Sequence, residues 1–152
     1  MDSLIRNLVK LAHSEEAIPT SDITMVSVSD IAEAGAEIFR PLAEVAGKSL
    51  TADIAPALAV SGVPDDIRRL LSLLLDNAVK YCDEGGTIQF VLVRRGKNAV
   101  IRISNPCSGL DASQLPHYFD RFYRADSSRA RATGGTGIGL STAKTIVTRH
   151  HG

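Results

Sequence analysis

Two neighbouring segments near the middle of the chain alternate apolar and polar residues, and they constrain the fold more than any other feature. They are TIQFVLVRR at 87–95 and NAVIRISN at 98–105, separated by Gly96 and Lys97. A period of two is typical of half-buried strands, and a short connection containing glycine favours a hairpin. The sequence therefore predicts an antiparallel strand pair that needs other elements to cover its apolar face.

Helical spacing of apolar residues supplies those covering elements. The pattern predicts helices from about residue 29 or 30 to 46, from Pro64 to Tyr81, and from Gly139 to His150. Pro41 inside the first of them allows a kink or an early end. Strand-like stretches at 23–29, 49–54 and 57–62 are mixed with the helices. This mixture predicts an α+β fold, a two-layer sandwich with helices on one face of a mixed, mostly antiparallel sheet.

Charge and hydropathy exclude several classes of function. The 152 residues carry 17 basic and 17 acidic side chains, so bulk charge favours neither nucleic acid nor an anionic membrane. The longest apolar run, LLSLLL at 70–75, is far shorter than the roughly 18 residues that cross a bilayer. The two cysteines lack metal-ligand spacing, which favours ordinary thiols in a reducing cytoplasm.

The helix at 64–81 ends in DNAVKY, which places Asn77, Lys80 and Tyr81 on one face. Asparagine offers a carbonyl oxygen to a hard cation, lysine a charge to phosphate, and tyrosine a flat surface to a purine. The alternative interpretation is an amphipathic helix whose polar flank faces water.

Two later segments also suit phosphate. FDRFYRADSSRAR at 119–131 is rich in arginine, whose guanidinium group matches phosphate oxygens, although its aspartates could pair with those arginines instead. GGTGIGLS at 134–141 lets the backbone approach a ligand closely before a helix whose first N–H groups are unpaired. Alone, it could equally be a flexible loop.

The order of these segments is more specific than any one of them. The chain contains, in this order, DNAVKY, the hairpin, SNPCSGL, FDRFYRAD and GGTGIGLS. This order resembles that of the ATP-binding catalytic domain of sensor histidine kinases, a family with the Bergerat fold. The resemblance covers residues 22–152. The resemblance implies about three helices on one face of the sheet and a final edge strand that this sequence lacks. It also implies that residues 1–18 are the C-terminal tail of a dimerisation and histidine-phosphotransfer helix.

The resemblance implies specific roles for individual residues, with ATP and Mg²⁺ as cofactors. Asn77 would bind Mg²⁺, Lys80 would contact phosphate, and Tyr81 would lie along the adenine; the first two are the candidate catalytic residues. The remaining candidates for ATP binding are Asn105, Gly109, Arg124, Arg129, Gly135, Thr136, Gly137, Gly139 and Leu140.

Three positions depart from the family pattern. Asn105 stands where an aspartate usually accepts a hydrogen bond from the adenine amino group, and Cys107 stands where a glycine is usual. Leu73, one turn before Asn77, cannot activate water, so an ATP hydrolase is disfavoured. These departures leave an alternative open: a degenerate domain with weak or no ATP binding that acts as an interaction or signalling module.

None of the four histidines, His13, His117, His150 and His151, lies in the sequence context of a phosphoacceptor. The resemblance therefore implies transfer of the γ-phosphoryl group to a histidine on a dimerisation domain outside this chain, in a homodimeric parent. It further implies a response regulator as the next partner, and a cytoplasmic location, either free or as the cytoplasmic portion of a membrane-bound sensor. An anti-sigma serine kinase, a third alternative, is weakened by the helix at 1–18 and by FDRFYR.

Overall fold

The computed structural model describes residues 22–124 and 137–152, and it confirms the predicted α+β class. The elements follow one another as β1 (Thr24–Ser27), α2 (Val28–Val45), β2 (Ser49–Ile54), β3 (Ala59–Gly62), α3 (Pro64–Tyr81), β4 (Thr87–Arg95), β5 (Asn98–Ser104), the 3-10 helix η2 (Ala112–His117) and α5 (Gly139–Arg149). None of the helices in these two ranges is long and apolar enough to cross a membrane.

The main sheet is built around β4. Its strand order is β2-β4-β5, with β4 parallel to β2 and antiparallel to β5. The predicted hairpin is confirmed, and Arg95 pairs with Asn98 across the turn. Strands β1 and β3 form a separate antiparallel pair.

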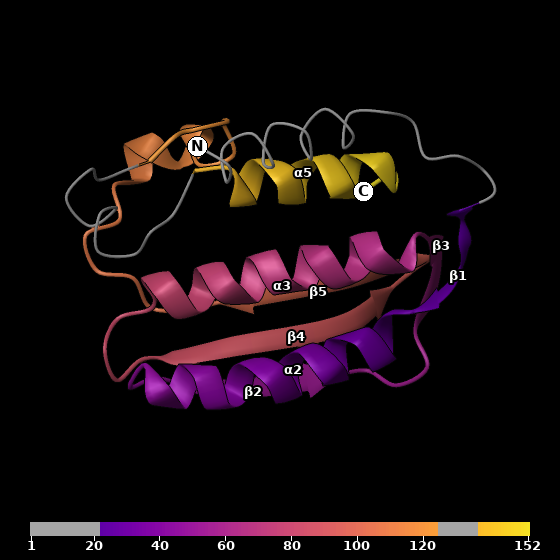
Figure 1. Cartoon of the computed structure of the whole chain (residues 1–152), viewed down its shortest axis with the longest axis horizontal. Helices are drawn as coiled ribbons and strands as arrows, with labels where there is room; N and C mark the ends of the chain where they lie inside the picture. The colour runs from indigo at the N-terminus through magenta and orange to yellow at the C-terminus, as the bar shows by residue number, and fades with distance from the viewer. Residues whose placement is uncertain (1–21, 125–136) are drawn as a thin grey trace, which may run out of the picture.

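The core lies between this sheet and helices α2 and α3 (Figure 1). Alternation along β4 directs Ile88, Phe90 and Leu92 to the helices, and all three side chains are fully buried. Leu71 and Leu75 of α3, one turn apart, are buried in the same cluster. The period-two and helical patterns read from the sequence thus meet in one apolar interior.

Helix α5 adds a third helix beside α3. Figure 1 shows α5 running along α3 on the side away from α2. A second, smaller cluster joins them, formed by Leu70 of α3 with Ala143 and Ile146 of α5. Leu73 and Leu74 pack against it. The apolar face of α5 is therefore buried mainly by α3.

The C-terminal end of α5 is held to the start of α3 by polar contacts. The Val63 N–H donates to His150 Nε2 at 3.1 Å, and His150 Nδ1 lies 2.8 Å from the Ile146 carbonyl oxygen. Because a carbonyl only accepts, the imidazole proton is on Nδ1. Arg149 and Asp66 form an ion pair at 3.6 Å in which both side chains are about four-fifths buried.

Helix α2 begins earlier than its pattern predicts, and β1 is correspondingly shorter than 23–29. Ser27 caps the helix by accepting a hydrogen bond from the Asp30 N–H. Ser29 lies inside the first turn, where its buried hydroxyl donates to the Ala55 carbonyl at 2.6 Å. Pro41 does not end the helix, which continues to Val45.

Candidate functional site

The predicted polar face of α3 is present and accessible. Asn77 is half-buried, and its side chain has no hydrogen bond to any residue that the structure describes. Tyr81 is 41% exposed. Lys80 pairs with Asp76 at 2.7 Å, one helical turn away. Exposed pairs of this kind contribute little stability, so Lys80 can exchange its partner for another anion.

The start of α5 lies against the same face. A Cβ atom on Gly139 would lie 3.7 Å from Leu73 Cδ2, which shows how closely the two helices approach. Leu73 precedes Asn77 by one turn, so the first turn of α5, which includes the half-buried Leu140, lies about one turn from Asn77. The N-cap residue of α5, Ile138, has no side-chain acceptor for the first N–H groups. Such a helix start favours an anion.

Phe122 and Gly137, which flank the segment 125–136, lie in contact. The Phe122 N–H donates to the Gly137 carbonyl at 2.9 Å. Gly137 has a φ of +70°, and a Cβ there would lie 2.9 Å from the Phe122 carbonyl carbon, so only glycine fits. Arg124 is exposed at the edge of the described part. The other candidates of this region, Arg129, Gly135 and Thr136, lie outside the described residues.

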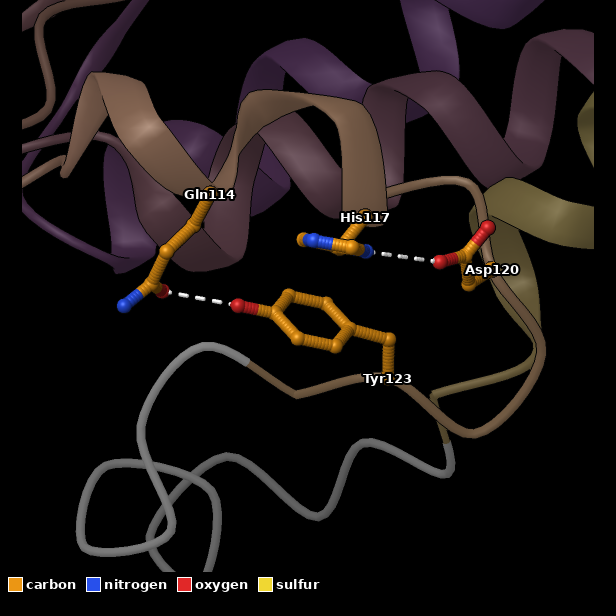
Figure 2. A network of polar contacts seen from close by, with 4 residues as sticks. All are labelled: Gln114, His117, Asp120 and Tyr123. Atoms are coloured by element: carbon orange, nitrogen blue, oxygen red, sulfur yellow. Dashed lines mark hydrogen bonds and ion pairs between the residues drawn. The ribbon is translucent and has the colours of Figure 1, made fainter.

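A polar network holds the residues that lead into this segment (Figure 2). The Tyr123 hydroxyl donates to Gln114 Oε1 at 2.8 Å, and His117 Nδ1 lies 3.0 Å from Asp120 Oδ2. The His117 and Tyr123 rings lie side by side, with centroids 5.6 Å apart. Helix η2 is therefore linked to Tyr123 at two points.

The loop after β5 is fixed to the turn after α3. The Asp83 N–H donates to the Pro106 carbonyl at 2.9 Å. The Asp83 carboxylate accepts from both the N–H and the hydroxyl of Ser108 at 2.8 Å. Asn105 uses its amide NH₂ group toward the Pro106 carbonyl at 3.2 Å, and Gly109 takes a left-handed φ of +79°. The loop that carries both candidates is thus positioned beside the end of α3.

Tyr118, the C-cap residue of η2, is half-buried and packs edge-on against Tyr123. Burial raises the pKa of the Tyr118 phenol. Neighbouring acidic groups raise this pKa further; from the largest effect to the smallest they are Tyr123, Cys107, Asp111 and Tyr81.

Asp111 caps the N-terminus of η2. Its carboxylate accepts from the Ser113 hydroxyl at 2.7 Å and from the Ser113 N–H at 2.9 Å, and these bonds lower the pKa of Asp111. The pKa of Asp111 is therefore lower in the folded state than in the unfolded chain. The stability that this cap contributes is fully present above the unfolded-state pKa, and it is lost as the pH falls through the folded-state pKa.

Sequence reasoning missed the contacts that position these segments. Asp83 and Gly86, between α3 and β4, were not among the predicted site residues, yet Asp83 binds Ser108 and Gly86 packs against Pro106. His150, which lacks the sequence context of a phosphoacceptor, links α5 to α3. An acidic residue two positions beyond the end of a helix was the available signal for Asp83; nothing local identifies its partner 25 residues away.

The fold and the candidate site define a two-layer α+β domain of Bergerat type. The candidate site lies on one face of α3, between the start of α5 and the loop after β5. Residues 62–152 match the model of the histidine kinase-, DNA gyrase B- and HSP90-like ATPase family, and the chain belongs to this family.

Curated relatives and solved structures agree with this assignment. The chain is 31% identical to the sensor histidine kinase RppB of Synechocystis sp. and 30% identical to the signal transduction histidine-protein kinase BaeS of Escherichia coli K12. Both alignments cover 100% of this chain but only 34% and 32% of the relatives, so the chain spans about a third of their length.

Among solved structures, full-length ShkA in complex with AMPPNP matches with a TM-score of 0.79 at 19% identity, covering 97% of this chain and 30% of that one. The mycobacterial sensor histidine kinase MprB matches with a TM-score of 0.68 at 22% identity, covering 85% and 80%. These likenesses show the fold.

Proposed function

We propose that this chain is the ATP-binding catalytic domain of a two-component sensor histidine kinase. The observation that carries the proposal is the contact between Leu73 and Gly139, which places the uncapped start of α5 one helical turn from Asn77. The proposed Mg²⁺ ligand would then lie near a helix start suited to anions, as binding of Mg-ATP would require. The named kinases that match the whole chain support the proposal.

The residues present fit both cofactors. Asn77 would hold Mg²⁺ through its carbonyl oxygen, and Lys80 would leave Asp76 to contact phosphate. Tyr81 and the loop with Asn105 and Gly109 would hold the adenine. When bound, Mg-ATP supplies a γ-phosphoryl group that can be transferred to an imidazole nitrogen.

The segments around residues 122–140 would enclose the phosphates. Arg124 and Arg129 would neutralise charge, and Gly135, Thr136, Gly137 and Gly139 would let the backbone approach. The first N–H groups of α5, beginning near Leu140, would donate to phosphate oxygens. The work of these residues is positioning and charge neutralisation.

The proposed partners lie outside this chain. The acceptor histidine would belong to a dimerisation domain, of which residues 1–18 would be the C-terminal tail, and a response regulator receiver domain would take the phosphoryl group next. The parent would be a homodimer, and this domain would lie in the cytoplasm. The fragment alone would bind ATP without phosphorylating itself.

Thermal melting with and without Mg-ATP tests the proposal. At a ligand concentration about 100 times Kd, binding stabilises the folded state by about 2.7 kcal/mol. For a chain of this size that is a Tm increase of roughly 5–10 °C. Asn77→Ala should lose the increase, because it removes the proposed Mg²⁺ ligand.

The control is Ser72→Ala, at an exposed position of the same helix, which should keep the full increase. An unchanged wild-type melting curve, together with no heat in calorimetric titration, would favour the degenerate interaction module, for which Asn105, Cys107 and Leu73 are the sequence support. A full increase in Asn77→Ala would remove Asn77 from the proposed site.

A further inference from the structure

The two cysteines of the chain, 25 residues apart in sequence, are brought together by the fold. Cys82 is the C-cap residue of α3, and Cys107 lies in the loop after β5. Hydrogen bonds join their immediate neighbours: the Asp83 N–H binds the Pro106 carbonyl, and the Asp83 carboxylate binds Ser108. The residues on either side of Cys107 are therefore fixed to the residue that follows Cys82.

The side chain of Cys82 points toward the loop that carries Cys107. A Cβ on Gly86 would lie 2.7 Å from Cys82 Sγ and 2.6 Å from Pro106 Cγ, so the sulfur and the proline ring border the same spot. A disulfide needs Cα atoms about 4.4–6.8 Å apart. The hydrogen bond from the Asp83 N–H to the Pro106 carbonyl favours a close approach of the residues beside it, Cys82 and Cys107.

The two thiols differ in accessibility. Cys82 is only 5% exposed, whereas Cys107 is half-buried. Burial raises the pKa of Cys82, and the neighbouring Asp83 and Cys107 raise it further against the opposing effect of Lys48. A dissolved oxidant therefore meets Cys107 first, and Cys82 is placed to react second.

We propose that Cys107 and Cys82 form a peroxide-responsive thiol pair that closes to a disulfide between the end of α3 and the loop after β5. The Cys107 thiolate attacks one peroxide oxygen, the O–O bond breaks, and the products are a sulfenic acid and, after protonation, water. The Cys82 sulfur then attacks the sulfenic sulfur. The S–S bond forms, the S–O bond breaks, and the leaving hydroxide takes the Cys82 proton to give a second water. Two thiols are oxidised and one peroxide is reduced.

The chain contains no third cysteine, so the intramolecular product is unique. In a reducing compartment such a bond forms only under oxidative challenge, as in redox sensors. The bond would restrain the loop that bears Asn105 and Gly109. Its formation does not depend on nucleotide binding, so the chemistry can be tested even if the proposed function fails.

The test treats the full chain with hydrogen peroxide, alkylates the remaining thiols and measures intact mass and peptide maps. The expected product has lost a pair of hydrogen atoms, takes up no alkylating agent, and yields one peptide pair linked through Cys82 and Cys107. Thiol reductant should restore both free thiols. Two alkylated cysteines after oxidation, or a disulfide found only between two chains, would overturn the proposal.

Single variants test the order of the two steps. In Cys82→Ala, dimedone should trap Cys107 as a sulfenic acid, whereas in Cys107→Ser it should leave the buried Cys82 unlabelled. Cys82→Ser serves as a second variant at the buried position, and circular dichroism checks that each variant is folded. The opposite result would be dimedone labelling of Cys82 in Cys107→Ser and no labelling of Cys107 in the folded Cys82 variants. That result would contradict the assigned order and with it the proposal.

Discussion

Gly86 is the residue at which the packing around the candidate site is tightest. A Cβ there would lie 2.8 Å from the Asp83 carbonyl oxygen, in addition to its close approaches to Cys82 and Pro106. Its neighbour Gly85 has a left-handed φ of +70°, and a Cβ there would meet nothing within 4 Å. The two glycines are therefore required for different reasons, conformation at Gly85 and space at Gly86.

We expect Gly86→Ala to lower the free energy of unfolding by about 1–3 kcal/mol, because backbone and a proline ring must move to admit the methyl group. Urea unfolding monitored by circular dichroism measures this change. The control is Gly35→Ala inside α2, where the new Cβ would lie 3.4 Å from a flexible Leu75 methyl. Helix propensity should make that variant neutral or more stable. Equal losses in both variants would contradict the crowding at Gly86.

Residue positions that depend on helical periodicity were predictable, and contacts between residues far apart in the sequence were not. Spacings of three and four residues necessarily place Asn77, Lys80 and Tyr81 on one side of α3. The bond from Asp83 to Ser108 depends on how two loops meet after the sheet has formed. The assigned roles of the candidate residues remain predictions that the melting experiment addresses.

Among the elements, α5 depends most on a few specific contacts. Its apolar face meets α3, and its C-terminal end is linked to the start of α3 by His150. A Cβ on Gly62 would lie only 2.7 Å from the His150 ring, so the imidazole is closely packed there. The adjacent His151 is exposed.

We expect His150→Ala to lower the free energy of unfolding by about 1–3 kcal/mol, because the Val63 N–H loses its acceptor and the ring leaves a gap. His151→Ala is the matched control; because His151 has a left-handed φ of +61°, which alanine adopts slightly less readily than histidine, this variant should lower stability by less than about 1 kcal/mol. Chemical denaturation of both variants makes the comparison. Similar losses in the two would show that the histidine does not act through Val63.

Element boundaries were predictable where local chemistry sets them. Pro64 fixes the start of α3, and the alternating pattern fixes the hairpin, whereas Ser27 begins α2 earlier than the apolar spacing suggested. The parallel pairing of β2 with β4 carries no local signal, because it joins residues such as Ser49 and Thr87 across an intervening helix.

At the scale of the whole molecule, the described residues pack into two apolar clusters of unequal size. The larger lies between the sheet and helices α2 and α3, and the smaller joins α3 to α5. The mixture of strand and helix patterns predicted the layers. The position of α5 beside α3 could not be read from the pattern, since its apolar face would fit a sheet equally well.

We expect the amide protons of α5 to exchange with solvent faster than those of β4. Fewer buried contacts hold α5 in place, so its local unfolding costs less free energy than that of β4. The amide protons of α3, which contributes to both clusters, should be protected as strongly as β4. Hydrogen exchange followed by mass spectrometry on peptides from each element measures this order. Protection in α5 equal to that in β4 would show that the molecule opens only as one unit.

The hydrogen bond from Val63 to His150 also sets a limit on how small this domain can be made. Helix α3 has no side chain of its own to cap its start, and its first partner comes from 87 residues further along the chain. A fragment that ends before His150 would leave that N–H without its acceptor. The shortest version in which the helix carrying Asn77 begins as it does here therefore extends at least through His150.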